Sequence, residues 1–180
     1  MRYYTMRYQS MIGSMILASD HNSLVGLWNE GQKYFGATLD GLTVEKPDLP
    51  VLVDAGIWLD AYFAGKNPAI ADLPLAPSGN AFRQAVWNAL CEIPYGTCTT
   101  YGAIARDIAR IMNKKSMSGQ AVGGAVGHNP ISVIIPCHRV VGSNGSLTGY
   151  AGGIAKKISL LAHEGVDTAQ FIIPAKGTAL

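Results

Sequence analysis

The spacing of apolar residues changes along the chain and predicts different elements in turn. Two short apolar runs at 15–19 and 24–28 flank a polar, turn-rich gap, which is the pattern of a β-hairpin. Between 52 and 63 the apolar positions instead recur at helical spacing, and Gly65 follows as a residue type that commonly ends a helix. The first part of the chain therefore predicts a hairpin followed by a helix.

A connector containing Pro, Ser and Gly at 72–79 separates this part from a second one, and the charge changes with it. Residues 1–80 contain five basic and eight acidic residues, for a net charge of −3, whereas residues 81–180 contain nine and four, for +5. We therefore predict two domains, at 1–76 and 77–180. The basic second domain favours an anionic partner such as nucleic acid, and a merely solvated basic face is the alternative.

Three helices are predicted in the second domain, each preceded by a residue that can cap its start. The helices and their candidate caps are 82–90 (Ser78 or Asn80), 101 to about 112 (Thr99 or Thr100) and 119–126 (Ser118). The last two, joined by a polar turn with Lys114 and Lys115, have the outline of a helix-turn-helix unit.

The third of these helices is rich in glycine, which costs about 1 kcal/mol per residue relative to alanine inside a helix. Small residues allow a backbone to approach something bulky. That neighbour could be another helix or a nucleic-acid groove, and the pattern alone does not choose between them.

The strongest chemical signal follows the apolar run 131–135, which predicts a buried strand leading to Pro136-Cys137-His138-Arg139. A thiol beside an imidazole and a guanidinium is expected to have a lowered pKa and to react as a thiolate nucleophile. Adjacent side chains on an extended chain point to opposite faces. Cys137 and His138 can therefore cooperate only if the chain turns there or if a water bridges them.

Three further residues could complete such a site, and each also has a simpler interpretation. Glu164 ends the predicted helix at 154–164, where a carboxylate interacts unfavourably with the negative end of the helix dipole. A contact with His138 would offset this unfavourable energy; alternatively, the glutamate is simply exposed. Asn129 could hydrogen-bond within its own turn. Tyr101, at the start of a helix, could donate a proton or touch a phosphate, or could pack on the core.

Composition limits the class of protein. Hydrophobic residues make up 48% of the chain and charged residues only 14%, which suits a packed core rather than disorder. No apolar stretch approaches the about 20 residues of a membrane helix, and the first residues lack the apolar core of a secretory signal. The three cysteines and four histidines show no metal-ligand spacing, so we predict no metal and interpret Cys91 and Cys98 as ordinary thiols. A soluble protein of the reducing cytoplasm is expected.

The run Ile135-Pro136-Cys137-His138-Arg139-Val140-Val141 closely resembles the active-site signature of the O6-alkylguanine-DNA alkyltransferases, also called methylated-DNA–protein-cysteine methyltransferases. Other segments occur in that family's order, namely Thr100-Tyr101-Gly102, 121–125, Asn129-Pro130, Tyr150 with Gly152-Gly153, and 160–165. The resemblance is strong from Phe82 to Gly165 and weak over 1–75.

The resemblance implies an α/β (α+β) fold. A small ribonuclease-H-like N-terminal domain would precede a mostly helical C-terminal domain, with the helix-turn-helix and a short strand leading to the active-site cysteine. The implied partner is double-stranded DNA containing O6-alkylguanine, bound with the second helix of the unit in the minor groove. The damaged base would be flipped out and its alkyl group transferred irreversibly to Cys137 in direct-reversal DNA repair. O4-alkylthymine is a further expected substrate; no cofactor is implied, and a monomer is expected because each molecule reacts once.

By the same resemblance, His138 takes the thiol proton through a water and is oriented by Glu164. Tyr101 protonates the leaving guanine at N3, and Asn129 braces the site. These roles assign the acid–base chemistry to four side chains from separate parts of the C-terminal half.

The flipped base is expected to be held mainly by backbone and small residues. The carbonyls of Cys137 and Val140 would accept from the guanine amino group. The further residues expected to contact the base or the DNA are Gly102, Gln120, Ala121, Gly123, Gly124, Ser143, Tyr150 and Ala151. Two of them depart from the family pattern: Gln120 replaces a frequent arginine that fills the gap left by the base, and Ala151 replaces a serine found in some members.

Two other functions compete with this one. A non-catalytic sensor of alkylated DNA would keep the fold, but such proteins typically have tryptophan at the position of Cys137. A thiol hydrolase would need repeated turnover, and its cysteine commonly opens a helix, whereas Cys137 is predicted to follow a strand.

Overall fold

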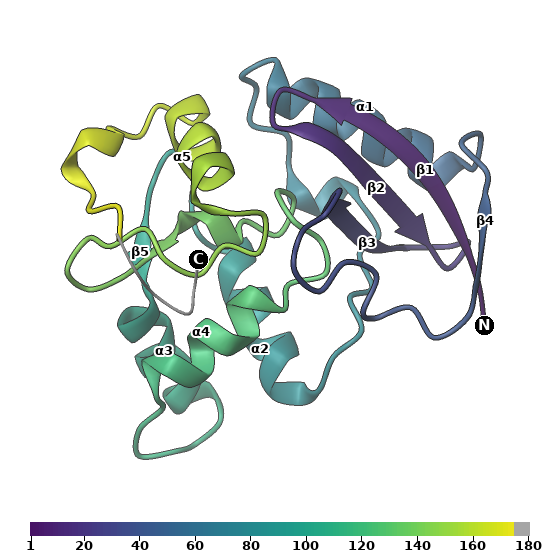
Figure 1. The fold of residues 1–180 in the computed structure, drawn as a ribbon. Helices are drawn as coiled ribbons and strands as arrows, with labels where there is room; N and C mark the ends of the chain where they lie inside the picture. The colour runs from purple at the N-terminus through teal and green to yellow at the C-terminus, as the bar shows by residue number, and fades with distance from the viewer. Residues whose placement is uncertain (175–180) are drawn as a thin grey trace. The chain divides into compact units, whose positions relative to one another are not determined.

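The computed structural model describes residues 1–174, so the last six residues of the predicted second domain lie outside the described part. The chain divides into two compact units. The first contains Met1–Ser78 and Pro130–Ile134, and the second contains Gly79–Asn129 and the described residues from Ile135 onward (Figure 1). The segment 130–134 thus belongs to the first unit, although it lies within the predicted second domain.

The first unit is built on a four-stranded sheet in the order β3-β2-β1-β4. Its strands are β1 Arg2–Ser10, β2 Gly13–Ser19, β3 Leu24–Asn29 and β4 Leu42–Glu45. β2 pairs antiparallel with both β1 and β3, which confirms the predicted hairpin, and β4 runs parallel to β1. β1 carries no apolar run, because polar residues interrupt its tyrosines and Met6, and only its pairing with β2 and β4 identifies it as a strand.

Helix α1, Pro50–Phe63, lies along one face of this sheet and confirms the predicted helix (Figure 1). Proline occupies its first turn, where no intrahelical donor is needed. Leu52 and Leu59 are fully buried on its inner side. Gly65 follows the helix with a φ of 77°, in the left-handed region that favours glycine.

Three helices of the second unit pack against one another, and the last two are the predicted helix-turn-helix pair. They are α2 Ala81–Cys91, α3 Tyr101–Ile111 and α4 Gly119–Gly127, with Asn80, Thr100 and Ser118 as their caps. Each cap accepts a hydrogen bond from a backbone N–H of the first turn, which satisfies a donor that the helix cannot. The helix predictions and one candidate cap for each are confirmed.

The remaining elements are short, apart from one helix. They are β5 Thr99–Thr100, β6 Val140–Val141, α5 Ile154–His163, and the 3-10 helices η1 Ile70–Asp72, η2 Cys137–Arg139 and η3 Thr168–Gln170. β5 and β6 pair in parallel. Val141, Leu147 and Leu161 form a buried cluster that ties β6 to α5. No helix within residues 1–174 is both long and apolar enough to cross a membrane.

The predicted strand at 131–135 is wrong. Only Ile131 pairs, in an isolated bridge with Leu27, supported by hydrogen bonds between Leu27 N and Pro130 O and between Ser132 N and Leu27 O, both 2.8 Å. Val133 then adopts a φ of 71°, which no strand allows, and the chain turns. The run is apolar because it is buried on all sides, and a short buried turn cannot be distinguished from a buried strand by apolar residues alone.

Candidate active site

Cys137 and His138 lie in η2, a single 3-10 turn that starts directly after Pro136. Both side chains are buried, with exposed fractions of 4% and 0%. Because the chain turns here, the two side chains are not constrained to opposite faces as they would be in a strand. Cooperation between Cys137 and His138 was expected to need either a turn of the chain or a bridging water, and the turn is present.

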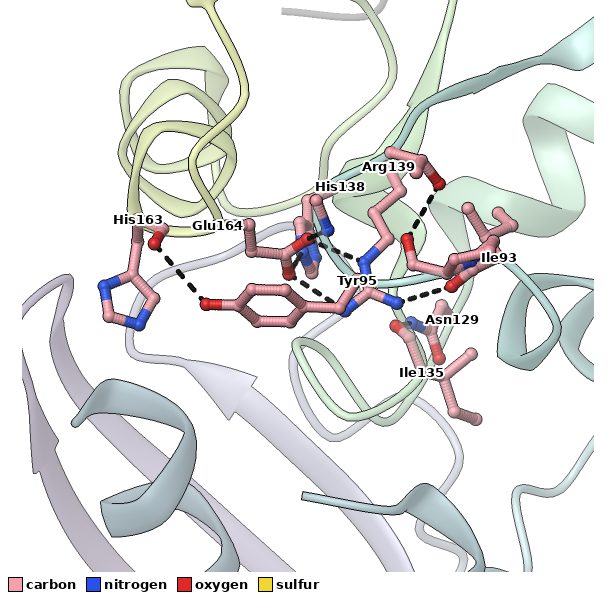
Figure 2. Close-up of polar contacts among 11 residues, drawn as sticks. Ile93, Tyr95, Asn129, Ile135, His138, Arg139, His163 and Glu164 are labelled. Carbon is pink, nitrogen blue, oxygen red and sulfur yellow. Dashed lines mark hydrogen bonds and ion pairs between the residues drawn. The ribbon is translucent and has the colours of Figure 1, made fainter. Parts of the chain in front are cut away.

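Glu164, the residue that ends α5, orients His138 through its carboxylate. His138 Nε2 lies 2.7 Å from Glu164 Oε1. Arg139 binds the same carboxylate, with Nε donating to Oε2 at 2.8 Å and Nη2 donating to Oε1 at 3.0 Å. Figure 2 shows the carboxylate between these two neighbours. Glu164 is 5% exposed, so its interpretation as an exposed glutamate is wrong.

Further contacts hold this cluster in place. Arg139 Nη1 donates to the carbonyl of Ile93 at 2.6 Å, and the guanidinium lies 5.6 Å from the centre of the Tyr95 ring. The backbone N–H of Gly96 donates to Glu164 Oε2 at 3.1 Å. The loop that follows α2 therefore fixes the ion pair from one side.

These contacts set the charge states of the cluster. Burial alone would raise the pKa of Glu164, but the bonds from His138 and Arg139 outweigh it and lower that pKa to about 2. Burial lowers the pKa of His138, and the Arg139 charge acts in the same direction against the Glu164 contact. We therefore describe Glu164 as ionised and His138 as neutral at pH 7.

A neutral His138 has a defined tautomer in this arrangement. Its Nε2 faces a carboxylate, which only accepts, so Nε2 carries the hydrogen and Nδ1 has the free lone pair. Within residues 1–174, His138 Nδ1 is buried and has no hydrogen-bond partner. Nδ1 is therefore the nitrogen that can accept a proton.

The expected lowering of the Cys137 pKa is wrong. Burial raises the pKa of this thiol, because a thiolate loses its hydration inside the protein. A hydrogen bond from Asn129, the charge of Lys157 and backbone N–H groups act in the opposite direction without reversing the shift. The sequence shows a thiol beside cations but not how deeply it is buried.

Asn129 braces the turn that carries Cys137. Its Nδ2 donates to the carbonyl of Ile135 at 2.8 Å, and Cys137 N donates to the same carbonyl at 2.8 Å (Figure 2 shows the Asn129 contact). This side-chain bond reaches six residues along the chain. The interpretation of Asn129 as a residue bonded only within its own turn is therefore wrong.

Burial raises the pKa of Tyr101, the first residue of α3, and the negative charge that Cys137 carries as a thiolate would raise it further. Its hydroxyl donates to the carbonyl of Thr148 at 2.7 Å. A Cβ added at Gly149 would come within 2.3 Å of that hydroxyl, so only glycine fits there. The Tyr101 side chain is part of this polar cluster and also packs against α4.

The small residues of α4 lie on two sides of the helix, one packed against α3 and one exposed. A Cβ at Gly123 would make ordinary contact, at 3.8 Å, with the Tyr101 ring, so this side of the helix faces α3. A Cβ at Gly124 would meet nothing within 4 Å, and Gln120 and Ala121 are exposed. One side of α4 packs on a helix while another is open. The small residues are therefore compatible both with packing against a helix and with close approach to a nucleic-acid groove.

The other predicted residues differ in exposure. Val140 is fully buried in β6, and Tyr150 is buried at 3% exposed, whereas Gly102 and Ala151 are half-buried. Ser143 lies exposed in the turn after β6. The structure brings six of the predicted residues into one connected cluster. His138 contacts Glu164, and Asn129 contacts Cys137. Tyr101 and Val140 are linked through Lys157, which binds the carbonyls of Val140 and Thr148, while Tyr101 binds the same Thr148 carbonyl.

Sequence reasoning missed the site roles of Lys157 and of Arg139 as a ligand of Glu164. Lys157 is fully buried, and its Nζ donates to the carbonyls of Val140 at 2.5 Å and Thr148 at 2.7 Å. One signal was available, because Lys157 falls between Ile154 and Leu161 on the buried face of α5. Within residues 1–174, no group of three or more His, Cys, Asp and Glu side chains is arranged to hold a metal ion.

Two family models match consecutive parts of the chain. Residues 2–77 match the ribonuclease-like domain of 6-O-methylguanine DNA methyltransferase, and residues 81–166 match the DNA binding domain of the same protein.

Similar proteins and structures point to the same family. The methylated-DNA–protein-cysteine methyltransferase of Haemophilus influenzae is 41% identical over 162 residues, which cover 90% of this chain and 86% of the relative. That of Methanosarcina acetivorans is 44% identical over 168 residues, covering 91% and 98%. The crystal structure of Mycobacterium tuberculosis OGT in complex with DNA is 38% identical, covers 97% of this chain and 96% of its own, and has a TM-score of 0.75.

These similarities confirm the fold class and the enzyme class predicted from the sequence. The chain belongs to the methylated-DNA–protein-cysteine methyltransferase family.

Proposed function

We propose that this protein repairs O6-alkylguanine in double-stranded DNA by moving the alkyl group onto Cys137 and keeping it there. The observation that carries the proposal is the buried turn that places Cys137 next to a neutral His138, itself held by the ionised Glu164. A nucleophile, a base and a group that orients the base are the parts that covalent catalysis by a thiol requires.

The first step is removal of the thiol proton. His138 Nδ1 accepts it through a water, while Nε2 keeps its bond to Glu164 at 2.7 Å. The imidazolium that forms is stabilised by the carboxylate, which is already ionised. Since burial raises the pKa of Cys137, the thiolate is formed when substrate is bound rather than held in advance.

The second step is attack of the thiolate on the alkyl carbon. The S–C bond forms as the bond between that carbon and guanine O6 breaks, and the electron pair leaves on the guanine. Tyr101 donates its proton to N3 of the leaving base. Both the Tyr101 phenol and the Cys137 thiol have raised pKa values, so each holds its proton until the reaction demands it.

The guanine is held by backbone groups of η2 and β6. The carbonyls of Cys137 and Val140 accept from its amino group, and the Val140 carbonyl can do so while bound by Lys157 because a carbonyl oxygen has two lone pairs. Tyr150 and Ala151 line the place of the base. The half-buried Ala151 leaves room for larger alkyl groups, and O4-alkylthymine is a second proposed substrate.

DNA binding is assigned to α3 and α4. The exposed Gly124 and Ala121 allow α4 to approach the minor groove closely, and the exposed Gln120 fills the gap left by the flipped base. The relative from Mycobacterium tuberculosis was solved in complex with DNA, which supports this partner. Gly102 and Ser143 complete the proposed DNA contacts.

The mass of the intact protein tests the proposal. After incubation with a duplex containing O6-methylguanine, the mass should rise by one methyl group, located on the Cys137 peptide, and Cys137→Ala should show no change. Tight binding without a change in mass would instead indicate a damage sensor, and repeated turnover would indicate a hydrolase. Either result would overturn the proposal.

We further propose that the protein acts as a monomer in the reducing cytoplasm. Each molecule reacts once with its own cysteine, so the reaction needs no second copy. The three cysteines are free thiols, as expected in a reducing compartment. Sedimentation of the protein with and without duplex DNA checks the monomer, and a dimer in both states would contradict it.

A further inference from the structure

Lys157 is a buried ammonium group that the proposed reaction does not use. It is fully buried, and its Nζ donates to Val140 O at 2.5 Å and to Thr148 O at 2.7 Å. Burial lowers the pKa of Lys157 to about 8, because an ammonium group loses its hydration inside the protein. Packing of α5 alone would be served better by an apolar side chain of similar length.

The carbonyl of Thr148 connects Lys157 to Tyr101. It accepts from Lys157 Nζ and from the Tyr101 hydroxyl, both at 2.7 Å. The space around the hydroxyl is closed on one side by Gly149, which has a φ of 80° and where a Cβ would lie 2.3 Å from the oxygen. A shift of the Thr148 carbonyl would therefore shift the proton donor as well.

Lys157 also brings a positive charge to the nucleophile. The titratable groups around it are Cys137, Cys98, His138 and Tyr101, from η2, the segment before β5, and α3. Its charge lowers the pKa of Cys137, against the effect of burial. Before the thiol proton moves, His138 is neutral and the Arg139 charge is paired with Glu164, so Lys157 supplies a positive charge near the sulfur in advance of the transfer.

We propose that Lys157 is a positioning residue for alkyl transfer, which holds the Val140 and Thr148 carbonyls and the Tyr101 hydroxyl in place and sets a positive charge beside the Cys137 sulfur. This inference rests on the proposed function and adds a residue to it. Lys157 forms and breaks no bond to the substrate. Its charge matters at the step in which the neutral thiol becomes a thiolate, so its loss should change the pH dependence of the reaction.

Single-turnover methyl transfer from an O6-methylguanine duplex, followed by protein mass from pH 6 to 10, tests this role. Lys157→Met should lower the rate about 10- to 100-fold below about pH 8, where Lys157 carries its charge, and the deficit should shrink above that pH as the wild-type ammonium group loses its proton. Lys157→Gln keeps two donors without a charge, and should show the same change in the pH profile with a smaller loss of rate. Lys156→Met, which removes the neighbouring half-buried lysine, should match the wild type.

A merely structural lysine would alter stability but leave the pH profile of transfer in place. Wild-type rate and profile in Lys157→Met would therefore overturn the inference. If circular dichroism shows that Lys157→Met does not fold, the profile of Lys157→Gln decides by the same criterion. A wild-type protein that gains no methyl group would overturn the proposed function and the role of Lys157 together, which is a different result from equal rates in two active proteins.

Discussion

His138 Nε2 and Glu164 Oε1 lie 2.7 Å apart, although the two residues are 26 positions apart in the chain. The carboxylate also receives two bonds from Arg139, the next residue after His138. One buried acid therefore orients the His138 imidazole and neutralises the adjacent guanidinium. Because the carboxylate is shared, a change at Glu164 should affect stability and chemistry together.

Glu164→Gln should destabilise the protein. It keeps the shape of the side chain but leaves the buried Arg139 guanidinium without its counter-charge, for an expected loss of about 3–5 kcal/mol. Urea denaturation measures this change. Glu92→Gln, at an exposed carboxylate that ends α2, is the matched control and should stay within about 0.5 kcal/mol of the wild type. Equal midpoints for the two variants would count against a supporting role for the ion pair.

The same carboxylate predicts a pH dependence of stability. Its pKa is lowered in the folded protein to about 2, below the ordinary 4.5, so the unfolded state binds the proton more readily. The stabilisation is therefore complete above about pH 4.5 and is lost as the pH falls toward 2. Melting temperatures measured from pH 5.5 down to 2.5 should fall more steeply for the wild type than for Glu164→Gln. Parallel curves would contradict this assignment.

Gln120→Arg should improve extrusion of the damaged base. The exposed Gln120 side chain can fill the gap left by the base but carries no charge, whereas arginine adds an electrostatic contact with the DNA. The expected result is faster methyl transfer at low protein concentration, with the chemistry at saturation less affected. Stopped-flow fluorescence of a 2-aminopurine placed next to O6-methylguanine reports the extrusion step. Identical repair rates in the two proteins would show that this position does not limit the reaction.

Gly124→Ala should separate the two interpretations of the small residues in α4. An added Cβ meets nothing within 4 Å in the free protein, so alanine should stabilise the helix by about 0.5–1 kcal/mol. If α4 approaches DNA closely, the same methyl group should weaken binding of the duplex. Thermal unfolding and fluorescence anisotropy with labelled DNA give the two readouts. A more stable variant with unchanged DNA affinity would place Gly124 outside the DNA contact.

Local patterns were sufficient to predict the helices of the second unit. The residues Asn80, Thr100 and Ser118 each cap the helix that follows them, because capping depends on groups only two or three positions apart. The candidate site could also be recognised from the sequence, since Cys137, His138 and Arg139 are consecutive. The sequence by itself therefore determined the main helices and the family, and it singled out Cys137 as the proposed nucleophile.

Tertiary structure alone decided how these groups work. Residues 131–135 were predicted to be a strand but form a turn, since their apolar character reflects burial and not pairing with a neighbouring strand. The thiol of Cys137 was expected to have a lowered pKa, yet burial raises it, because the cost of desolvation depends on what surrounds the sulfur in space. Lys157 joins the site for the same reason, through carbonyls 9 and 17 positions away in the chain. Capping and helical periodicity act between neighbours along the chain, whereas burial and charge pairing act between neighbours in the fold.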